Sequence, residues 1–495
     1  MTDIIALIVL TGVAFFLRLS HLVAKPFWFD ECFSVELARL NWNNFIHVLW
    51  WREANMTLYY LVLRLWLHVG QSEFFIRSLS VLIATATVPA IYWVSKLLFS
   101  RPVALIAAAL FTFNAYNVRY AQETRSYALF ALLGTLSSGF LVAWLRSPSR
   151  SHYTGYLITS ILGIYSHLYF LLLILAHWLA LRTFGWPQPD QATEANLAQL
   201  RRAWKAFAIA SVPLIVFVIK TGAGPIRWIH RPGIRDLLVF WKQFCGADGW
   251  LLPAVFAAAC ILLGIELFRR HSGRDPRAQA WPLQFLFVWL LFPIVLTIVL
   301  SFARPVFLPR YMIFAHPALL ILTAVAILQM HRAWLIAPGL AAILFLSWQG
   351  VCFAYHNDFD EQRDGSGAAT NFVLDHSRPG DAIIFDIAEA RVPYEFFRSE
   401  RAGQNTASSS FTALLGPEIL FPNDGPGLNY RDFRARLTPS FLSAAAPNHE
   451  RVWVFLIYNE NSDPTTTALK RTLPQWFPQV ESWHFPRVEI QLYHR

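Results

Sequence analysis

Apolar runs of about 20 residues recur along most of this chain, and they constrain its fold more than any other feature. A run of that length, wound as an α-helix, matches the thickness of the hydrocarbon core of a bilayer. Of the 495 residues 56% are hydrophobic and only 15% are charged. A soluble protein has about 25% charged residues. The sequence therefore predicts an α-helical polytopic membrane protein.

We expect about eleven spans within residues 1–354, from the positions of these runs. They are 4–23, 74–96, 103–118, 126–145, 153–166, 168–182, 204–221, 248–268, 282–302, 312–330 and 333–353. The first lacks a small-residue cleavage site, so it is expected to stay as an uncleaved anchor.

The loops between these spans differ in charge. One alternate set is basic and poor in acids, and it holds Lys96, Arg101, Arg146, Arg150, Arg182, Arg201, Arg202, Lys205, Arg269, Arg270, Arg274, Arg277, His331 and Arg332. The positive-inside rule makes that set cytoplasmic. The N-terminus is then inside, and segments 24–73 and 355–495 are outside. The other set also contains arginines, so charge favours this orientation without deciding it.

The outer loop 24–73 contains two short apolar stretches, Trp42–Trp51 and 58–67. Arg64 interrupts the second, which is too short to span. We expect both to be amphipathic helices in the outer interface. An alternative is that 58–67 spans within the bundle, which would invert part of the later topology.

From residue 355 the composition becomes more polar, and the apolar runs shorten to strand length. The predicted elements are buried strands at 381–386 and 451–458, helices at 368–377 and 465–474, a hairpin of 480–485 with 488–493, and a long loop at 400–430. We therefore predict a small extracytoplasmic α/β domain over 355–495.

Several classes of function lack their sequence signals. The net charge is +10, but the basic residues form no block of the kind that binds nucleic acid. The four cysteines have no metal-type spacing. No phosphate-binding loop, dinucleotide fingerprint or zinc spacing is present. These features argue against an ATP-driven enzyme and against one that uses a nucleotide sugar.

The adjacent carboxylates Asp30 and Glu31 directly follow the first apolar span. Acidic groups beside lipid are costly, which makes them functional candidates. An outer-face carboxylate can act as general base on an acceptor hydroxyl or amine, while arginines bind a phosphate leaving group. The alternative is that both residues cap an interfacial helix. A divalent cation bound by the pair is a further alternative, and no cofactor is otherwise indicated.

Several stretches resemble, in order, motifs of the GT-C superfamily of membrane glycosyltransferases. They are closest to its bacterial branch similar to protein O-mannosyltransferases and lipid A aminoarabinose transferase (glycosyltransferase family 39-like). The matching stretches are FWFDECFS at 27–34, NMTLYY at 55–60, FFIRSLS at 74–80, YAQETRSY at 120–127, YSHLYF at 165–170 and PRYM at 309–312. One departure is Met56-Thr57, where the family has Pro-Pro.

This resemblance implies a GT-C fold, a polyprenyl-phosphate-linked sugar donor and an inverting displacement with Asp30 as base. Glu31 would position an arginine, and the acceptor would be a lipid, glycan or protein. The candidate donor-phosphate or substrate residues are Asn55, Tyr59, Arg77, Glu123, Arg125, Tyr127, Tyr165, His167, Arg310 and Tyr311.

Each of these residues also has a structural interpretation. Arg77 could extend to the interface, Glu123 and Arg125 could form an ion pair across their turn, and His167 could be an ordinary interfacial histidine. A further group, Arg227, His230 and Arg231, could bind phosphate or simply anchor its loop at the interface.

The function predicted from the sequence is a multi-pass glycosyltransferase of the inner (plasma) membrane. The rival is a lipid or solute transporter or flippase, whose charges would line a path. Transporters usually contain internal repeats and broken midplane spans. No repeat is evident here, and the charges fall at one face, which favours the enzyme. A non-catalytic scaffold is a third alternative.

The predicted topology is tested by reporter fusions. Alkaline phosphatase fused after Arg495 should be active, and a fluorophore that matures only in the cytoplasm should be dark there, because eleven spans from an inside N-terminus end outside. A second fusion within 183–200 should report the cytoplasm. The opposite result after Arg495 would mean that the predicted number of spans is wrong by an odd number. The second fusion then shows whether the miscounted span lies before or after residue 183.

Overall fold

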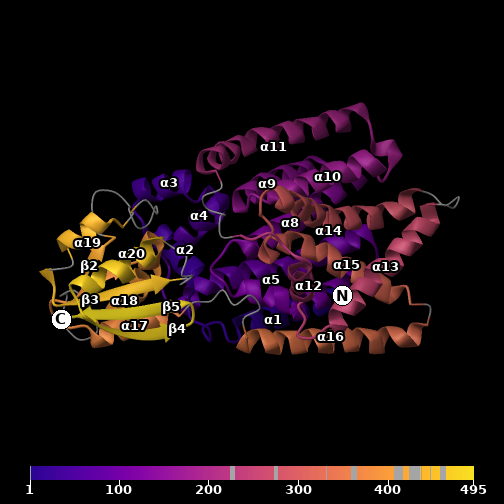
Figure 1. Ribbon diagram of the computed structural model, residues 1–495. Coiled ribbons are helices and arrows are strands. Elements are labelled where there is room, and N and C mark those ends of the chain that lie inside the picture. The colour runs from indigo at the N-terminus through magenta and orange to yellow at the C-terminus, as the bar shows by residue number, and fades with distance from the viewer. Residues whose placement is uncertain are drawn as a thin grey trace. The chain divides into compact units, whose positions relative to one another are not determined.

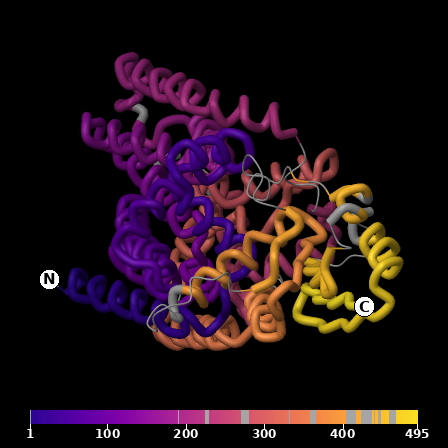
Figure 2. The backbone as a smooth tube through the Cα atoms, turned by 90° about the vertical axis from the view of Figure 1, so that its left-hand side faces the viewer, coloured from indigo at the N-terminus to yellow at the C-terminus, as the bar shows by residue number. Residues whose placement is uncertain are grey.

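The computed structural model describes residues 2–222, 229–271, 277–330, 332–357, 365–405, 416–422, 435, 437–445, 448–457 and 464–495. The chain divides into two compact units (Figures 1 and 2). The helical unit comprises Met1–Ala24 and Glu53–Phe359, and the mixed unit comprises Lys25–Arg52 and Asp360–Arg495. Assigning 1–354 to the membrane and 355–495 to the outside stays a prediction.

The helical unit contains only helices and their connections among its described residues. They are α1 (Thr2–Leu19), η1 (Ala54–Met56), α4 (Thr57–Trp66), α5 (Glu73–Leu98), α6 (Arg101–Phe113), α7 (Ala115–Ala121), α8 (Tyr127–Arg146), α9 (Arg150–Ser166), α10 (Phe170–Phe184), η2 (Pro189–Gln191), α11 (Glu194–Thr221), α12 (Ile234–Phe244), α13 (Leu251–His271), α14 (Arg277–Ala303), η4 (Pro309–Ala315), α15 (His316–Leu328) and α16 (Ala333–His356).

Within the described part of the chain, eight of these helical segments are long and apolar enough to cross a membrane, and α6 and α10 are shorter apolar helices. The prediction of a multi-pass helical membrane protein is confirmed. Each predicted span overlaps a helix of the structure. The stretch 58–67 falls in α4 (Thr57–Trp66), which has ten residues and ends one residue before Leu67. Such a helix is about 15 Å long, too short to cross a bilayer.

One predicted span, 103–118, is broken in the structure at Asn114. The Asn114 side chain accepts hydrogen bonds from the backbone N–H groups of Tyr116 and Asn117, and its Nδ2 donates to the carbonyl of Cys245 at 2.8 Å. Asparagine side chains compete with helical hydrogen bonds in this way and start new helices. The apolar run therefore forms two helices, α6 and α7, where the sequence predicted one.

Arg18 satisfies the carbonyl groups exposed at the end of α6. It is fully buried, and its guanidinium donates to the carbonyls of Phe111 at 3.2 Å and Thr112 at 3.4 Å. The last carbonyls of a helix have no partner inside it and carry partial negative charge. A buried arginine can therefore serve helix packing alone.

The mixed unit contains a five-stranded sheet of order β2-β1-β3-β5-β4. The strands are β1 (Ala382–Phe385), β2 (Glu418–Phe421), β3 (Arg451–Ile457), β4 (Gln479–Phe485) and β5 (Val488–His494). Strands β2, β1 and β3 are parallel, and the β4–β5 hairpin pairs antiparallel to β3. The predicted small α/β domain is thus present. The predicted loop at 400–430 is wrong in part, because it contains β2.

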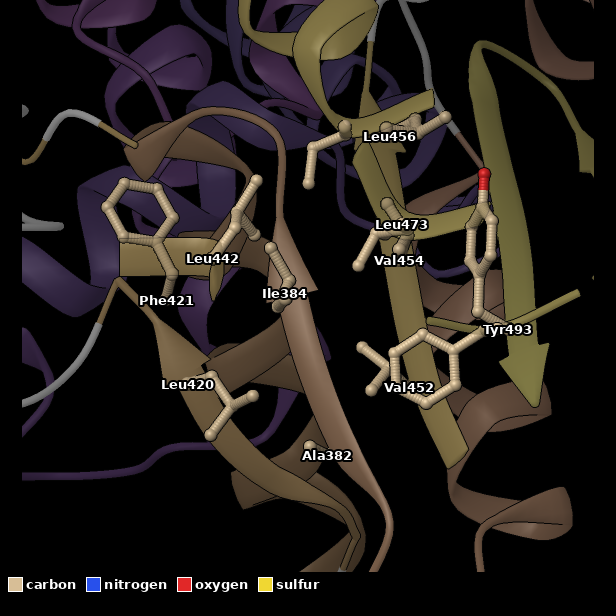
Figure 3. Packing of buried hydrophobic residues seen from close by; sticks show 12 residues of the cluster. Ala382, Ile384, Leu420, Phe421, Leu442, Val452, Val454, Leu456, Leu473 and Tyr493 are labelled. Atoms are coloured by element: carbon tan, nitrogen blue, oxygen red, sulfur yellow. The ribbon is translucent and has the colours of Figure 1, made fainter. Parts of the chain in front are cut away.

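Helices cover both faces of this sheet. The helices of the mixed unit are α2 (Phe29–Arg39), α3 (Trp42–Trp51), α17 (Ser366–His376), η5 (Ala388–Ala390), α18 (Arg391–Asn405), α19 (Pro439–Ala445), α20 (Pro464–Thr472) and η7 (Leu473–Gln475), and of these α2 packs on α18. Side chains alternate along β3, so Val452, Val454 and Leu456 pack beneath α19 and α20. Figure 3 shows this side of the sheet. Trp453 and Phe455 pack on the other side with α17 and α18.

Candidate functional site

Three connections of the helical unit meet around one histidine. His167 lies in the turn between α9 and α10, and its ring stacks on Phe130 of α8 at 4.8 Å. Its ring also lies 4.6 Å from that of Tyr311 in η4. Phe130 in turn contacts Phe314, with ring centroids 4.7 Å apart. Helix α8, the α9–α10 turn and η4 therefore meet in one cluster around His167, Phe130, Tyr311 and Phe314, which we call the histidine cluster.

Two arginines flank His167 in this cluster. Arg125 comes from the α7–α8 loop and is 6% exposed, and Arg310 comes from η4 and is 5% exposed. Burial of the imidazole, together with the positive charges of Arg125 and Arg310, lowers the pKa of His167 to about 3. His167 is therefore neutral at physiological pH, and the guanidinium groups carry the positive charge of the cluster.

The hydrogen bonds of His167 define its tautomer. The backbone N–H of Tyr169 donates to Nδ1 at 3.2 Å, so the ring hydrogen lies on Nε2. Nε2 is buried and has no hydrogen-bond partner among the described residues. The Tyr169 hydroxyl donates to the carbonyl of Val306, which holds the turn against the segment before η4. The imidazole thus presents a fixed N–H donor.

A short network from the segment 53–60 holds Arg125. Its Nη1 donates to the Tyr60 hydroxyl at 3.1 Å, and that hydroxyl donates to Oε1 of Glu53 at 3.1 Å. The predicted residue Asn55 accepts from the backbone N–H of Leu168, next to His167, at 2.8 Å. The structure therefore brings Asn55 together with the histidine cluster. The sequence analysis did not select Tyr60 and Glu53, although Tyr60 belongs to the NMTLYY stretch.

Arg77 and Tyr59 have their described hydrogen bonds elsewhere in the helical unit. Nη1 of Arg77 donates to the carbonyl of Leu22 at 2.9 Å, and the side chain is 1% exposed, so it does not extend to the interface. The Tyr59 hydroxyl lies 3.2 Å from Oγ of Ser80 on α5. These contacts link α5 to α4 and to the segment that follows α1.

Glu123 and Tyr127 lie at the two ends of the α7–α8 loop. Oε1 of Glu123 is 3.6 Å from Nε of Arg119, and both side chains are buried. The Tyr127 ring meets the edge of the Tyr120 ring at 5.3 Å. Glu123 thus pairs with Arg119, one helical turn back in the sequence, and an ion pair of Glu123 with Arg125 stays a prediction.

Asp30 and Glu31 belong to the mixed unit, where they occupy the first turn of α2. The partial positive charge at a helix N-terminus favours carboxylates at these positions. Glu31 is fully buried. Helix α2 packs on α18, with Phe27 stacked on Phe396 at 5.0 Å. Their predicted catalytic roles stay predictions.

The last group of candidates, Arg227, His230 and Arg231, lies only partly within the described residues. Arg227 lies outside the described residues. His230 and Arg231 are exposed, and Nε2 of His230 is 3.7 Å from Oδ1 of Asp236. Among the described residues, no group of three or more His, Cys, Asp or Glu side chains could hold a metal ion.

Comparison with known proteins identifies the fold. No protein-family profile and no curated protein matches the sequence. The structure resembles ArnT from Cupriavidus metallidurans in the apo state, with a TM-score of 0.66, 11% identity and coverage of 99% of this chain and 97% of that chain. It also resembles ArnT bound to undecaprenyl phosphate, with a TM-score of 0.58, 13% identity and coverage of 98% and 97%.

A third similar structure comes from Archaeoglobus fulgidus. The chain matches that archaeon's oligosaccharyltransferase, in complex with zinc and sulfate, with a TM-score of 0.51 at 12% identity. The match covers 91% of this chain and 67% of the other. ArnT and this oligosaccharyltransferase have the GT-C fold, so the fold expected from the sequence motifs is confirmed.

The network around Arg125 yields a prediction on stability. Tyr60→Phe should reduce the free energy of unfolding by about 1.5–3 kcal/mol, because it removes hydrogen bonds to the charged groups Arg125 and Glu53. Tyr165→Phe is the matched control. The Tyr165 hydroxyl on α9, another predicted site residue, donates to the neutral carbonyl of Ala210 at 2.9 Å, so about 0.5–1.5 kcal/mol should be lost. Thermal unfolding in detergent measures both, and equal losses would contradict the network.

Proposed function

We propose that this protein is an inner-membrane glycosyltransferase that takes a sugar from a polyprenyl-phosphate carrier at the outer face. The acceptor is a lipid, a glycan or a protein. The observation that carries the proposal is the pair of buried guanidinium groups, Arg125 and Arg310, on one neutral histidine. Arginine binds phosphate oxygens through paired N–H groups, and such bonds are strongest in a site of low dielectric.

The proposed reaction is an inverting displacement at the anomeric carbon. Asp30 takes the proton of an acceptor hydroxyl or amine while that group attacks the anomeric carbon. The bond between this carbon and the phosphate oxygen breaks, and its electron pair leaves with the phosphate. Arg125 and Arg310 stabilise the negative charge that gathers there, with Arg77 as a third candidate. Glu31 orients an arginine.

The structural comparisons support the donor class. One similar structure is ArnT bound to undecaprenyl phosphate, and another is the archaeal oligosaccharyltransferase AglB with an inhibitory peptide and a dolichol-phosphate, with a TM-score of 0.50, 10% identity and coverage of 92% and 69%. Both ligands are polyprenyl-type phosphates. We propose the same class here, with the N-terminus in the cytoplasm and the mixed unit outside, where it would select the acceptor.

Substitution of the proposed base tests the function directly. Asp30→Asn should lower the rate of transfer by about 10²–10⁴-fold, because it removes the base and keeps the size of the side chain. Cells carrying only this variant should accumulate the polyprenyl-phosphate sugar, measured by mass spectrometry of lipid extracts.

The matched control is Glu36→Gln on the same helix. Glu36 lies 3.6 Å from Arg39, and the proposal gives it no part in the reaction, so its loss should leave transfer near the wild-type rate. If Asp30→Asn retains more than about half of the wild-type rate, Asp30 is not the base. An unchanged lipid and envelope glycan profile in cells lacking the protein would count against the whole proposal.

Arg310→Lys tests the phosphate site. Lysine keeps the charge but loses the planar pair of donors, so the apparent affinity for the donor should fall more than that for the acceptor. Steady-state kinetics with each substrate varied in turn measures the two affinities. If only the apparent affinity for the acceptor changes, Arg310 does not bind the donor phosphate.

A further inference from the structure

Arg310 lies in an element that depends on its neighbours for its position. It is the second residue of η4, a 3₁₀-helix of seven residues, Pro309–Ala315. Runs of 3₁₀-helix longer than three or four residues are uncommon, because the geometry of their hydrogen bonds is poorer than in an α-helix. Contacts with other elements therefore matter more than usual for where η4 holds its side chains.

Two aromatic donors hold the ends of the segment that contains η4. The Tyr169 hydroxyl, in the α9–α10 turn, donates to the carbonyl of Val306. The indole N–H of Trp289, on α14, donates to the carbonyl of Phe314 at 2.9 Å. The first bond lies before Arg310 in the sequence and the second lies after it, so neither acts directly on the peptide groups of that residue.

A third aromatic donor binds next to Arg310. The Tyr116 hydroxyl, from the first turn of α7, donates to the carbonyl of Pro309 at 2.6 Å. That carbonyl belongs to the peptide group that joins Pro309 to Arg310, and a peptide group is planar. A hydrogen bond to its oxygen therefore restrains the whole plane, which includes the Cα atom of Arg310.

The surroundings of Tyr116 hold its hydroxyl in place. The side chain is buried, and its ring centroid lies 5.3 Å from that of Phe244 on α12 and 5.2 Å from that of His316 at the start of α15. The backbone N–H of Tyr116 donates to Oδ1 of Asn114 at 3.0 Å. Nδ2 of Asn117, the next residue, lies 3.1 Å from Nδ1 of His316. The break in the helix at Asn114 thus places a restrained phenol beside η4.

We propose that Tyr116 is a positioning residue for Arg310. Its hydroxyl holds the peptide group before Arg310, so that the planar guanidinium keeps one orientation toward the donor phosphate. This inference rests on the proposed function, because it assumes that Arg310 binds that phosphate. It adds a residue that lies outside the stretches resembling GT-C motifs and that acts on the donor only through Arg310.

A purely structural Tyr116 would behave differently. The same side chain packs α7 against α12 and α15, so a structural role predicts a lower free energy of unfolding with unchanged ligand affinity. A positioning role predicts a loss of affinity that depends on the chemistry of residue 310. Arginine needs orientation because its donors form a rigid fork, whereas lysine carries a point charge on a flexible stem.

The test is equilibrium binding of undecaprenyl phosphate to the purified full-length protein in detergent. Tyr116→Phe keeps the ring and removes the hydroxyl. It should weaken binding by about tenfold, which is the low end for loss of a hydrogen bond to a charged group. In the Arg310→Lys background the same substitution should change binding by less than about twofold, because a flexible ammonium group does not depend on the peptide plane before it.

The matched control is Tyr355→Phe. The Tyr355 hydroxyl on α16 donates to the carbonyl of Leu17, so this variant also removes a hydrogen bond from a buried tyrosine to a main-chain carbonyl. Its acceptor belongs to α1 and not to η4. Both variants should lower the midpoint of thermal unfolding by similar amounts, and only Tyr116→Phe should weaken binding.

Three results would overturn the inference. They are a loss of less than about twofold for Tyr116→Phe, an equal loss in the Arg310→Lys background, and an equal loss for Tyr355→Phe. Each would leave the proposed function standing, because the wild type still binds the probe. If the wild type does not bind undecaprenyl phosphate at all, the proposed function and this inference fail together.

Discussion

The burial of guanidinium groups in an apolar helical bundle is the constraint on which the rest of the helical unit depends. Each such charge costs several kcal/mol to remove from water unless polar partners compensate it. Arg18 shows one solution, because its guanidinium donates to the carbonyls that end α6. Arg125 shows another, because a tyrosine and a glutamate from the segment 53–60 hold it.

The break between α9 and α10 places the histidine of the cluster. The bundle could have been built from uninterrupted helices, but α9 ends at Ser166 and α10 begins at Phe170. The short connection places an imidazole among Phe130, Tyr169 and Tyr311. Beside two arginines, that imidazole stays neutral. The cluster therefore combines fixed positive charge with a hydrogen-bond donor of fixed tautomer, which is the chemistry that a phosphate needs.

The candidate base is carried by a different part of the fold. Helix α2 belongs to the mixed unit, although more than 300 residues separate it in the sequence from α18, on which it packs. Apolar side chains are buried on both faces of the five-stranded sheet, so this unit has a hydrophobic core of its own.

The sequence by itself determined the class of fold. The thickness of the bilayer sets the length of a membrane-spanning helix, and apolar runs of that length can be recognised in the sequence without knowledge of tertiary contacts. The resemblance of its motifs to the GT-C superfamily also implied four residues of the histidine cluster, Arg125, His167, Arg310 and Tyr311. The sequence did not predict β2, a four-residue strand among Ser, Gly and Pro, because pairing with β1 and not local propensity makes that segment a strand. Only the tertiary structure decided which hydrogen-bond partners Arg125 and His167 have. Tyr60, Glu53 and Tyr169 were not selected, because partner choice depends on where separate helices end and not on the spacing of residues along the chain.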